Sequence, residues 1–166
     1  MAPILDQNSF EIISRNTEQT RRVGMRLGAL LKLGDVICLQ GDLGAGKTTL
    51  VQGIAAGWGS LDPVSSPTFV LVNLYRKLDG SRLYHLDAYR MSGPAEAVDL
   101  DLDEMLMEGP LVIEWADRIR LALPTSHLWV NLRWIDDSQR DLVFSAHGEA
   151  YKALLQSFRA RVYGVF

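Results

Sequence analysis

The sequence predicts a three-layer α/β fold with a mixed β-sheet. Three observations lead to this prediction. A short apolar run at 36–40 is followed by a glycine-rich turn and by a helical pattern that begins at Lys47. A second apolar run, at 111–115, is typical of a buried parallel strand. Polar turns at 79–81 and 136–138 separate pairs of strand-like segments, which indicates antiparallel hairpins beside the parallel strands.

The first half of the chain is expected to contain two strands and two helices. Residues 9–14 form the first strand, and hydroxyl and amide side chains at 16–20 precede a helix that should run to about Leu33. Apolar residues recur at helical spacing in this helix, namely Val23, Leu27, Leu30 and Leu31. The strand at 36–40 leads through the glycine-rich turn to a helix over about 47–56.

The second half alternates apolar or β-branched runs with helical patterns, bounded by turn residues. In chain order, the expected strands are 68–78, 82–86, 111–115, 127–135 and 140–147. The expected helices are 94–107, as one helix or two, 116–123 and 148–161. We find no internal repeat, low-complexity tract or linker in the sequence, and therefore expect one domain over residues 1–166.

Composition narrows the classes of function. Hydrophobic residues make up 48% of the chain, which is ordinary for a folded protein with a substantial core. The formal net charge of −3 argues against a surface built mainly to bind nucleic-acid phosphates. The single cysteine, Cys38, cannot form an internal disulfide, and no apolar run approaches the roughly 18 residues that span a membrane. We therefore expect a cytoplasmic protein without disulfides or membrane segments.

The segment 41–48 matches the phosphate-loop pattern G-x-x-x-x-G-K-[ST] in full. Its glycines permit the backbone turns that aim N–H groups inward, and the N-terminus of the next helix adds to this anion site. Lys47 should reach the β- and γ-phosphates, and Thr48 should give its hydroxyl to Mg²⁺. The loop residues expected to bind nucleotide are Gly41, Asp42, Leu43, Gly44, Ala45, Gly46, Lys47 and Thr48. The guanine-reading sequence Asn-Lys-x-Asp does not occur in the chain, so ATP or ADP is the expected nucleotide, held in a P-loop NTPase-like domain.

Two carboxylates come at the ends of predicted strands. Asp87 ends the strand after the loop helix, and Glu114 ends the most apolar strand in the chain. Ligands bind at the carboxyl ends of parallel strands, so both residues are candidates to hold Mg²⁺ or to orient the attacking water. Alternatively, Asp87 caps the turn before Arg90, and Glu114 pairs with Arg118. His85 is interpreted as a structural histidine.

Three further residues have two interpretations each. Thr17 either caps the first helix or lies near the nucleotide. Thr68 either follows a simple turn or belongs to a loop that senses the γ-phosphate and its Mg²⁺. Trp115 either packs in the core or covers the site.

Four segments in this order resemble the bacterial TsaE family, also called YjeE. They are Gly41–Thr49, Ser66–Phe69, His85–Arg90 and Ile113–Trp115. The resemblance covers roughly residues 17–147. The family usually has Leu where this chain has Ala88, and often Pro where it has Ala116, and these departures bear on local packing rather than on a proposed ligand.

The resemblance implies an ATPase that is needed to make N6-threonylcarbamoyladenosine at position 37 of tRNA. Such a protein acts with a TsaB–TsaD pair, and its contact with tRNA is indirect or local. By the same resemblance Lys47 binds phosphates, Thr48 and Glu114 bind Mg²⁺, and Asp87 supports the metal or the water. Further residues that match positions linked to activity are Thr49, Thr68 and Trp115.

Two other classes of function stay open from the residues alone. One is a small P-loop metabolite kinase, although the second half lacks an arginine-rich lid segment. The other is a nucleotide-dependent switch that binds protein partners and hydrolyses nothing at a useful rate.

Overall fold

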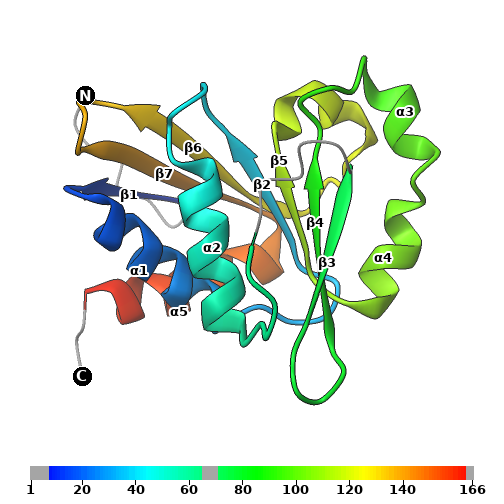
Figure 1. Cartoon of the computed structure of the whole chain (residues 1–166), viewed down its shortest axis with the longest axis horizontal. Helices are drawn as coiled ribbons and strands as arrows, with labels where there is room; N and C mark the ends of the chain where they lie inside the picture. Colours follow the sequence, from blue (N-terminus) through cyan, green and yellow to red (C-terminus); the bar gives the residue numbers. More distant parts are fainter. Residues whose placement is uncertain (1–7, 65–70, 164–166) are drawn as a thin grey trace.

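A computed structural model of the chain describes residues 8–64 and 71–163 (Figure 1). Its helices and strands are, in chain order, β1 (Ser9–Ser14), α1 (Thr17–Gly28), β2 (Val36–Gln40), α2 (Lys47–Trp58), β3 (Val72–Arg76), β4 (Arg82–Asp87), α3 (Pro94–Val98), α4 (Leu102–Glu108), β5 (Leu111–Glu114), the 3₁₀ helix η1 (Ala116–Ala122), β6 (His127–Trp134), β7 (Arg140–His147) and α5 (Glu149–Val162).

The strands form one mixed sheet in the order β1-β7-β6-β2-β5-β4-β3. β2 pairs in parallel with β5 and β6, and β5 pairs in parallel with β4. The outer pairs β1–β7, β6–β7 and β3–β4 are antiparallel. The mixed sheet predicted from the sequence is confirmed, with the strand that leads into the glycine-rich loop at its centre.

Helices cover both faces of this sheet (Figure 1). Successive residues of a strand point to opposite faces, so Cys38 and Leu39 on β2 mark the two sides. Leu39 belongs to a buried cluster with Ile54 of α2 and Phe158 of α5. Cys38 belongs to a second cluster with Leu102 of α4. The three-layer α/β fold is therefore confirmed, and burial raises the pKa of the Cys38 thiol to about 12.

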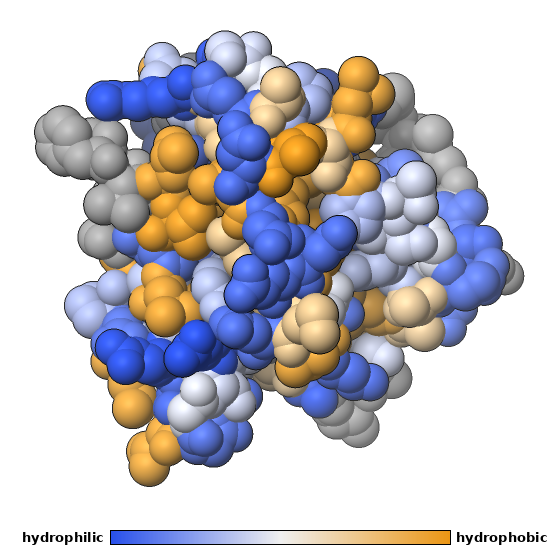
Figure 2. All heavy atoms as spheres, turned by 90° about the vertical axis from the view of Figure 1, so that its right-hand side faces the viewer, coloured by the Kyte–Doolittle hydropathy of each residue, from blue (hydrophilic) through white to orange (hydrophobic). Residues whose placement is uncertain are grey.

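Figure 2 looks onto the side that Figure 1 shows at the right, where α3, α4 and β3 lie. Apolar and hydrophilic residues are interspersed on it rather than separated into two areas. The most exposed apolar side chains of these elements and of the β3–β4 turn are Leu78, Met107 and Val98. No helix among the residues that the structure describes is long and apolar enough to cross a membrane.

Helices α1 and α2 pack backbone to backbone through glycines. A Cβ atom placed on Gly28 would lie 2.0 Å from the carbonyl oxygen of Ile54, and one on Gly53 would lie 2.1 Å from that of Arg21. Gly28 also faces Trp58, near the end of α2, so the two helices run in the same direction. Hydrophobic periodicity does not indicate this contact, so the sequence pattern did not predict it.

Helix α1 ends earlier than predicted, at Gly28 instead of about Leu33. After Gly28 the chain forms tight turns, in which the Leu31 N–H donates to the Gly28 carbonyl at 3.2 Å. Gly34 then takes a positive φ of 88° before β2 begins. Leu31 is nevertheless buried, so the apolar pattern continues beyond the helix and does not mark its end.

Other boundaries differ by smaller amounts. The segment 94–107 forms two helices, because Asp101 adopts a positive φ of 54° and its side chain caps α4. The segment expected as a helix at 116–123 is the 3₁₀ helix η1. Strand β5 ends at Glu114 rather than residue 115, and residues 68–70 of the expected strand 68–78 lie outside the described residues.

We expect Gly53→Ala to destabilise the protein, because the added methyl group meets backbone that cannot rotate away. Overpacking of this kind typically costs about 1–3 kcal/mol, so the free energy of unfolding should fall by about 2 kcal/mol. The matched control is Gly93→Ala, at a position with extended backbone and no atom within 4 Å of the added group. Denaturant unfolding of both variants tests the contact, and equal losses would contradict it.

A carboxyl pair joins β1 and β7. Asp141 is buried, and its Oδ2 accepts hydrogen bonds from Arg133. Its Oδ1 has no donor among the described residues unless Glu11 carries a proton. The pKa of Glu11 is raised, first by hydrogen bonding to the Asp141 carboxyl and then by burial. The folded protein therefore binds this proton more tightly than the unfolded chain does.

Stability should therefore fall as the pH rises from the ordinary glutamate pKa through the raised one, because Glu11 must ionise beside Asp141. We expect Glu11→Gln to raise the melting temperature at pH 7–8 and to have less effect near pH 4. Thermal unfolding across this range measures the difference. A gain that is independent of pH would show that the carboxyl pair is not its cause.

Candidate nucleotide-binding site

The glycine-rich loop joins β2 to α2, as the sequence predicted. Gly46 precedes the helix with a φ of 100°, in the left-handed region that favours glycine. A Cβ atom on Gly41 would lie 2.6 Å from the carbonyl oxygen of Leu132, so the start of the loop also has no room for a side chain. The loop meets the N-terminus of α2, where free backbone N–H groups favour anions.

Lys47 folds over this loop. Its Nζ donates to the Gly41 carbonyl and, at 2.9 Å, to the Asp42 carbonyl, and it lies 4.1 Å from the centroid of the Trp115 ring. Burial lowers the pKa of Lys47, while the nearby carboxylates, Glu114 first among them, oppose this shift. A positive charge thus lies against the loop within reach of several acceptors.

Glu114 and Asp87 are direct partners across the parallel pair β4–β5, at the carboxyl ends of both strands. Glu114 is only 3% exposed. Its Oε1 is 3.4 Å from the Thr48 hydroxyl, which donates to it. The alternative pairing with Arg118 is wrong: the Arg118 guanidinium lies over the Trp115 ring, 5.6 Å from its centroid, and forms no ion pair with Glu114.

The turn-capping interpretation of Asp87 is confirmed, and its role toward Mg²⁺ or the attacking water stays a prediction. Its Oδ1 accepts a hydrogen bond of 2.9 Å from the Tyr89 N–H, so it caps the turn after β4. It also lies beside Glu114 at the loop. Burial is the main cause that raises the pKa of Asp87, and the Glu114 charge adds to it. A bound cation would favour the ionised form of Asp87.

Trp115 has a φ of 56°, which turns the chain sharply after β5. Its ring stands beside Tyr89, at 4.9 Å between centroids, and over Lys47. It is half-buried, with part of its surface packed on the second core cluster. Trp115 therefore both contacts the core and covers the loop lysine.

Two buried residues near the loop were not predicted as site residues. His85 is fully buried, and its Nε2 lies 2.6 Å from Glu114 Oε2. Its Nδ1 lies 2.8 Å from the hydroxyl of Tyr75, on β3. The sequence offered one signal for His85, its place two positions before Asp87 on the same strand. It offered none for Tyr75.

Arg140 of β7 is a further residue that the sequence analysis missed. Its Nε donates to the Gly44 carbonyl at 3.1 Å, and its Nη1 donates to the Asp136 carbonyl at 2.7 Å. It thereby ties the glycine-rich loop to the β6–β7 turn.

The remaining predicted residues are placed as follows. Asn16, not Thr17, caps α1, so the capping interpretation of Thr17 is wrong. Thr17 is exposed at the end of α1 that lies level with the loop, and its contact with a nucleotide stays a prediction. Leu43 is exposed at the loop and Thr49 is half-buried in α2. Thr68 lies outside the described residues.

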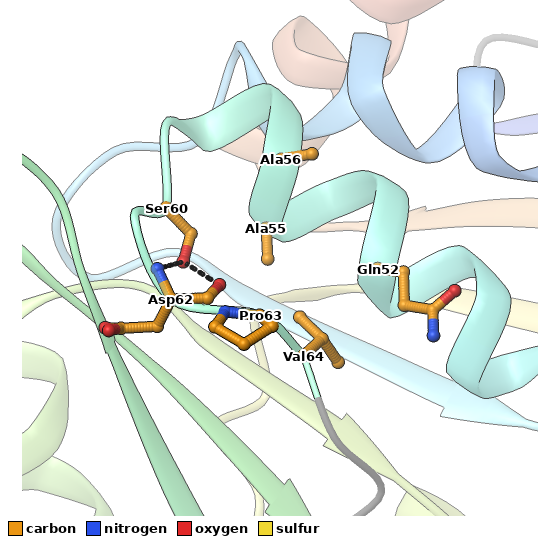
Figure 3. Close-up of a pocket in the computed structure, with 7 residues that line it drawn as sticks. All are labelled: Gln52, Ala55, Ala56, Ser60, Asp62, Pro63 and Val64. Carbon is orange, nitrogen blue, oxygen red and sulfur yellow. Dashed lines mark hydrogen bonds between the residues drawn. The ribbon is translucent and has the colours of Figure 1, made fainter.

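Residues 8–64 and 71–163 include the lining of two hollows near α2 and its loop. One, of about 510 Å³, adjoins the loop and is bordered by Asp42, Trp115, Arg133 and Trp134, among others. The other, of about 130 Å³, lies between the second half of α2 and the loop at 60–64, whose turn is held by hydrogen bonds of the Ser60 hydroxyl (Figure 3). Only the first is beside the phosphate-loop motif.

A central parallel strand, a glycine-rich loop and a following helix, with carboxylates at the ends of neighbouring strands, define a P-loop NTPase-like protein. The family model described as "Threonylcarbamoyl adenosine biosynthesis protein TsaE" matches residues 14–142. The chain belongs to the TsaE family, whose role is in the biosynthesis of threonylcarbamoyladenosine in tRNA, and the resemblance stated from the sequence is confirmed.

Individual relatives agree with this assignment. The chain is 41% identical over 143 residues to the tRNA threonylcarbamoyladenosine biosynthesis protein TsaE of Bacillus subtilis, covering 85% of this chain and 88% of that protein. The protein of the same description from Streptomyces coelicolor is 45% identical over 114 residues, covering 62% and 77%. The crystal structure of Bacillus subtilis YdiB superposes with a TM-score of 0.77 at 33% identity, covering 93% and 96%.

We expect Lys47→Ala to weaken ATP and ADP binding by about tenfold or more, the scale of losing a hydrogen bond to a charged group. The matched control is Lys77→Ala, since Lys77 also lies over a tryptophan ring, that of Trp58, but outside the loop. Calorimetric titration with both nucleotides measures the change. Unaltered affinity in Lys47→Ala would contradict the assignment of the site.

Proposed function

We propose that this protein binds ATP with Mg²⁺ and hydrolyses it in support of threonylcarbamoyladenosine formation on tRNA. The observation that carries the proposal is the approach of Thr48, in the phosphate-loop motif, to the buried carboxylate of Glu114, at 3.4 Å. A hydroxyl and a carboxylate at this point of the fold are the donors that P-loop ATPases present to their metal ion.

The loop itself supplies the proposed phosphate site. The α2 N-terminus and the loop N–H groups would bind the triphosphate, and Lys47 would exchange its present carbonyl partners for phosphate oxygens. Trp115 would limit water around the lysine, which strengthens the electrostatic attraction.

The oxygen donors at the site suit Mg²⁺. Thr48, Glu114 and Asp87 offer hydroxyl and carboxylate oxygens, and Mg²⁺ prefers one or two carboxylates completed by phosphate and water. Within the described residues no group of three or more His, Cys, Asp or Glu could hold a metal alone. When bound, Mg²⁺ neutralises charge that develops on the phosphates. Asp87, beside Glu114, would orient the attacking water or support the metal.

We further propose that the partner is a TsaB–TsaD-like protein pair in the cytoplasm, with tRNA contacted only indirectly. Membership of the TsaE family supports a role in threonylcarbamoyladenosine formation on tRNA. The net charge of −3 supports a protein partner rather than an extended tRNA contact.

The test is Mg²⁺-dependent ATP hydrolysis by the purified protein, with and without a purified TsaB–TsaD pair. We expect weak hydrolysis alone and a clear rise with the pair. Glu114→Ala should lower both by about a hundredfold, as losing transition-state stabilisation does. The control is Glu108→Ala, a glutamate that pairs with Arg82 at the surface.

Other outcomes would redirect the proposal. Full hydrolysis in Glu114→Ala would remove this carboxylate from the mechanism. Nucleotide binding without hydrolysis, with or without the pair, would favour a nucleotide-dependent switch. Phosphate transfer to a metabolite in step with ADP release would favour a kinase.

A further inference from the structure

A chain of hydrogen bonds runs from the edge strand β3 to the phosphate-loop helix. The Tyr75 hydroxyl lies 2.8 Å from His85 Nδ1, and His85 Nε2 lies 2.6 Å from Glu114 Oε2. The other oxygen of that carboxylate, Oε1, accepts from the Thr48 hydroxyl at 3.4 Å. The Glu114 carboxylate thus has one oxygen, Oε2, bound to buried His85 and the other, Oε1, bound to Thr48 at the glycine-rich loop.

These groups are shielded from water. His85 is 0% exposed, and Tyr75 and Glu114 are each 3% exposed. Buried hydrogen bonds hold their geometry because water cannot replace either partner. The imidazole ring is therefore fixed between the hydroxyl and the carboxylate.

Hydrogen-bond chemistry assigns the protons along this chain. An ionised carboxylate only accepts, so His85 Nε2 must carry a proton that it donates to Glu114. In the neutral ring Nδ1 then accepts the Tyr75 hydroxyl proton. The Asn73 side-chain amide donates a hydrogen bond of 3.5 Å to the same hydroxyl oxygen.

We propose that Tyr75 and His85 are positioning residues that fix the Glu114 carboxylate, with Oε2 held and Oε1 presented to Thr48. This proposal rests on the proposed ATPase function for its consequence. Partners behind a metal-binding group keep its orientation, and their loss typically lowers metal affinity or activity by about 10–100-fold.

The first experiment reads the hydrogen-bond chain itself, without any nucleotide. The protein has three histidines, so ¹⁵N-histidine labelling gives an NMR spectrum in which each histidine can be assigned. We expect the neutral Nε2–H tautomer for His85, and a changed Nδ1 resonance in Tyr75→Phe. An Nδ1–H tautomer, or a His85 spectrum that Tyr75→Phe leaves unchanged, would overturn the proposal.

The second experiment measures the consequence for the metal. We expect Tyr75→Phe to lower kcat about tenfold and to raise the Mg²⁺ concentration for half-maximal hydrolysis by a similar factor. KM for ATP should stay within about twofold, because the loop residues that bind phosphate are unchanged. The matched control is Tyr84→Phe, whose hydroxyl contacts Glu108 at the surface and should be silent.

Two further measurements distinguish a positioning role of Tyr75 and His85 from a general loss of protein stability. His85→Gln keeps an amide N–H donor and should recover part of the activity that His85→Leu loses.

The second measurement is a double-mutant cycle. In a Glu114→Gln background, Tyr75→Phe should no longer change the Mg²⁺ dependence of binding to a non-hydrolysable ATP analogue. Additive effects in this cycle would overturn the proposal. If the wild-type protein hydrolyses no ATP, the proposed function is wrong. The NMR measurement of the His85 tautomer would still test the hydrogen bonds from Tyr75 to Glu114.

Discussion

Burying the Glu114 carboxylate at the end of β5 removes a charge from water, and the residues around it offset that cost. His85 engages one oxygen and Thr48 the other, while Lys47 supplies a positive charge nearby. His85 lies on β4, and Thr48 and Lys47 both lie in the first turn of α2. The first turn of α2, and with it the glycine-rich loop, is therefore linked to the Glu114 carboxylate at the end of β5.

Sheet topology makes this meeting of elements possible. β5 lies between β2 and β4, and all three strands are parallel, so their carboxyl ends share one edge. The pairing register then sets Asp87 directly against Glu114. Two residues that are distant in sequence become neighbours because two strands end level with each other.

The sequence predicted what depends on local pattern and failed where register or long-range contact decides. The strand–loop–helix unit and the carboxylates at strand ends follow from composition and spacing. The place of Tyr75 does not, because it needs the register of β3 against β4, which no local pattern encodes. The contact between Arg140 and Gly44 joins residues that are 96 positions apart in the sequence, so local pattern does not predict it either. The early end of α1 was missed because Leu31 keeps the apolar pattern after the helix has stopped.

The glycine contact between α1 and α2 has a mechanical consequence. Side chains between two packed helices can change rotamer and so permit small sliding movements. At Gly28 and Gly53 no side chain separates the two backbones. We therefore expect α1 and α2 to move together. Under the proposed function, a displacement of α2 would also move α1, and a change at the loop would alter the position of the exposed N-terminus of α1.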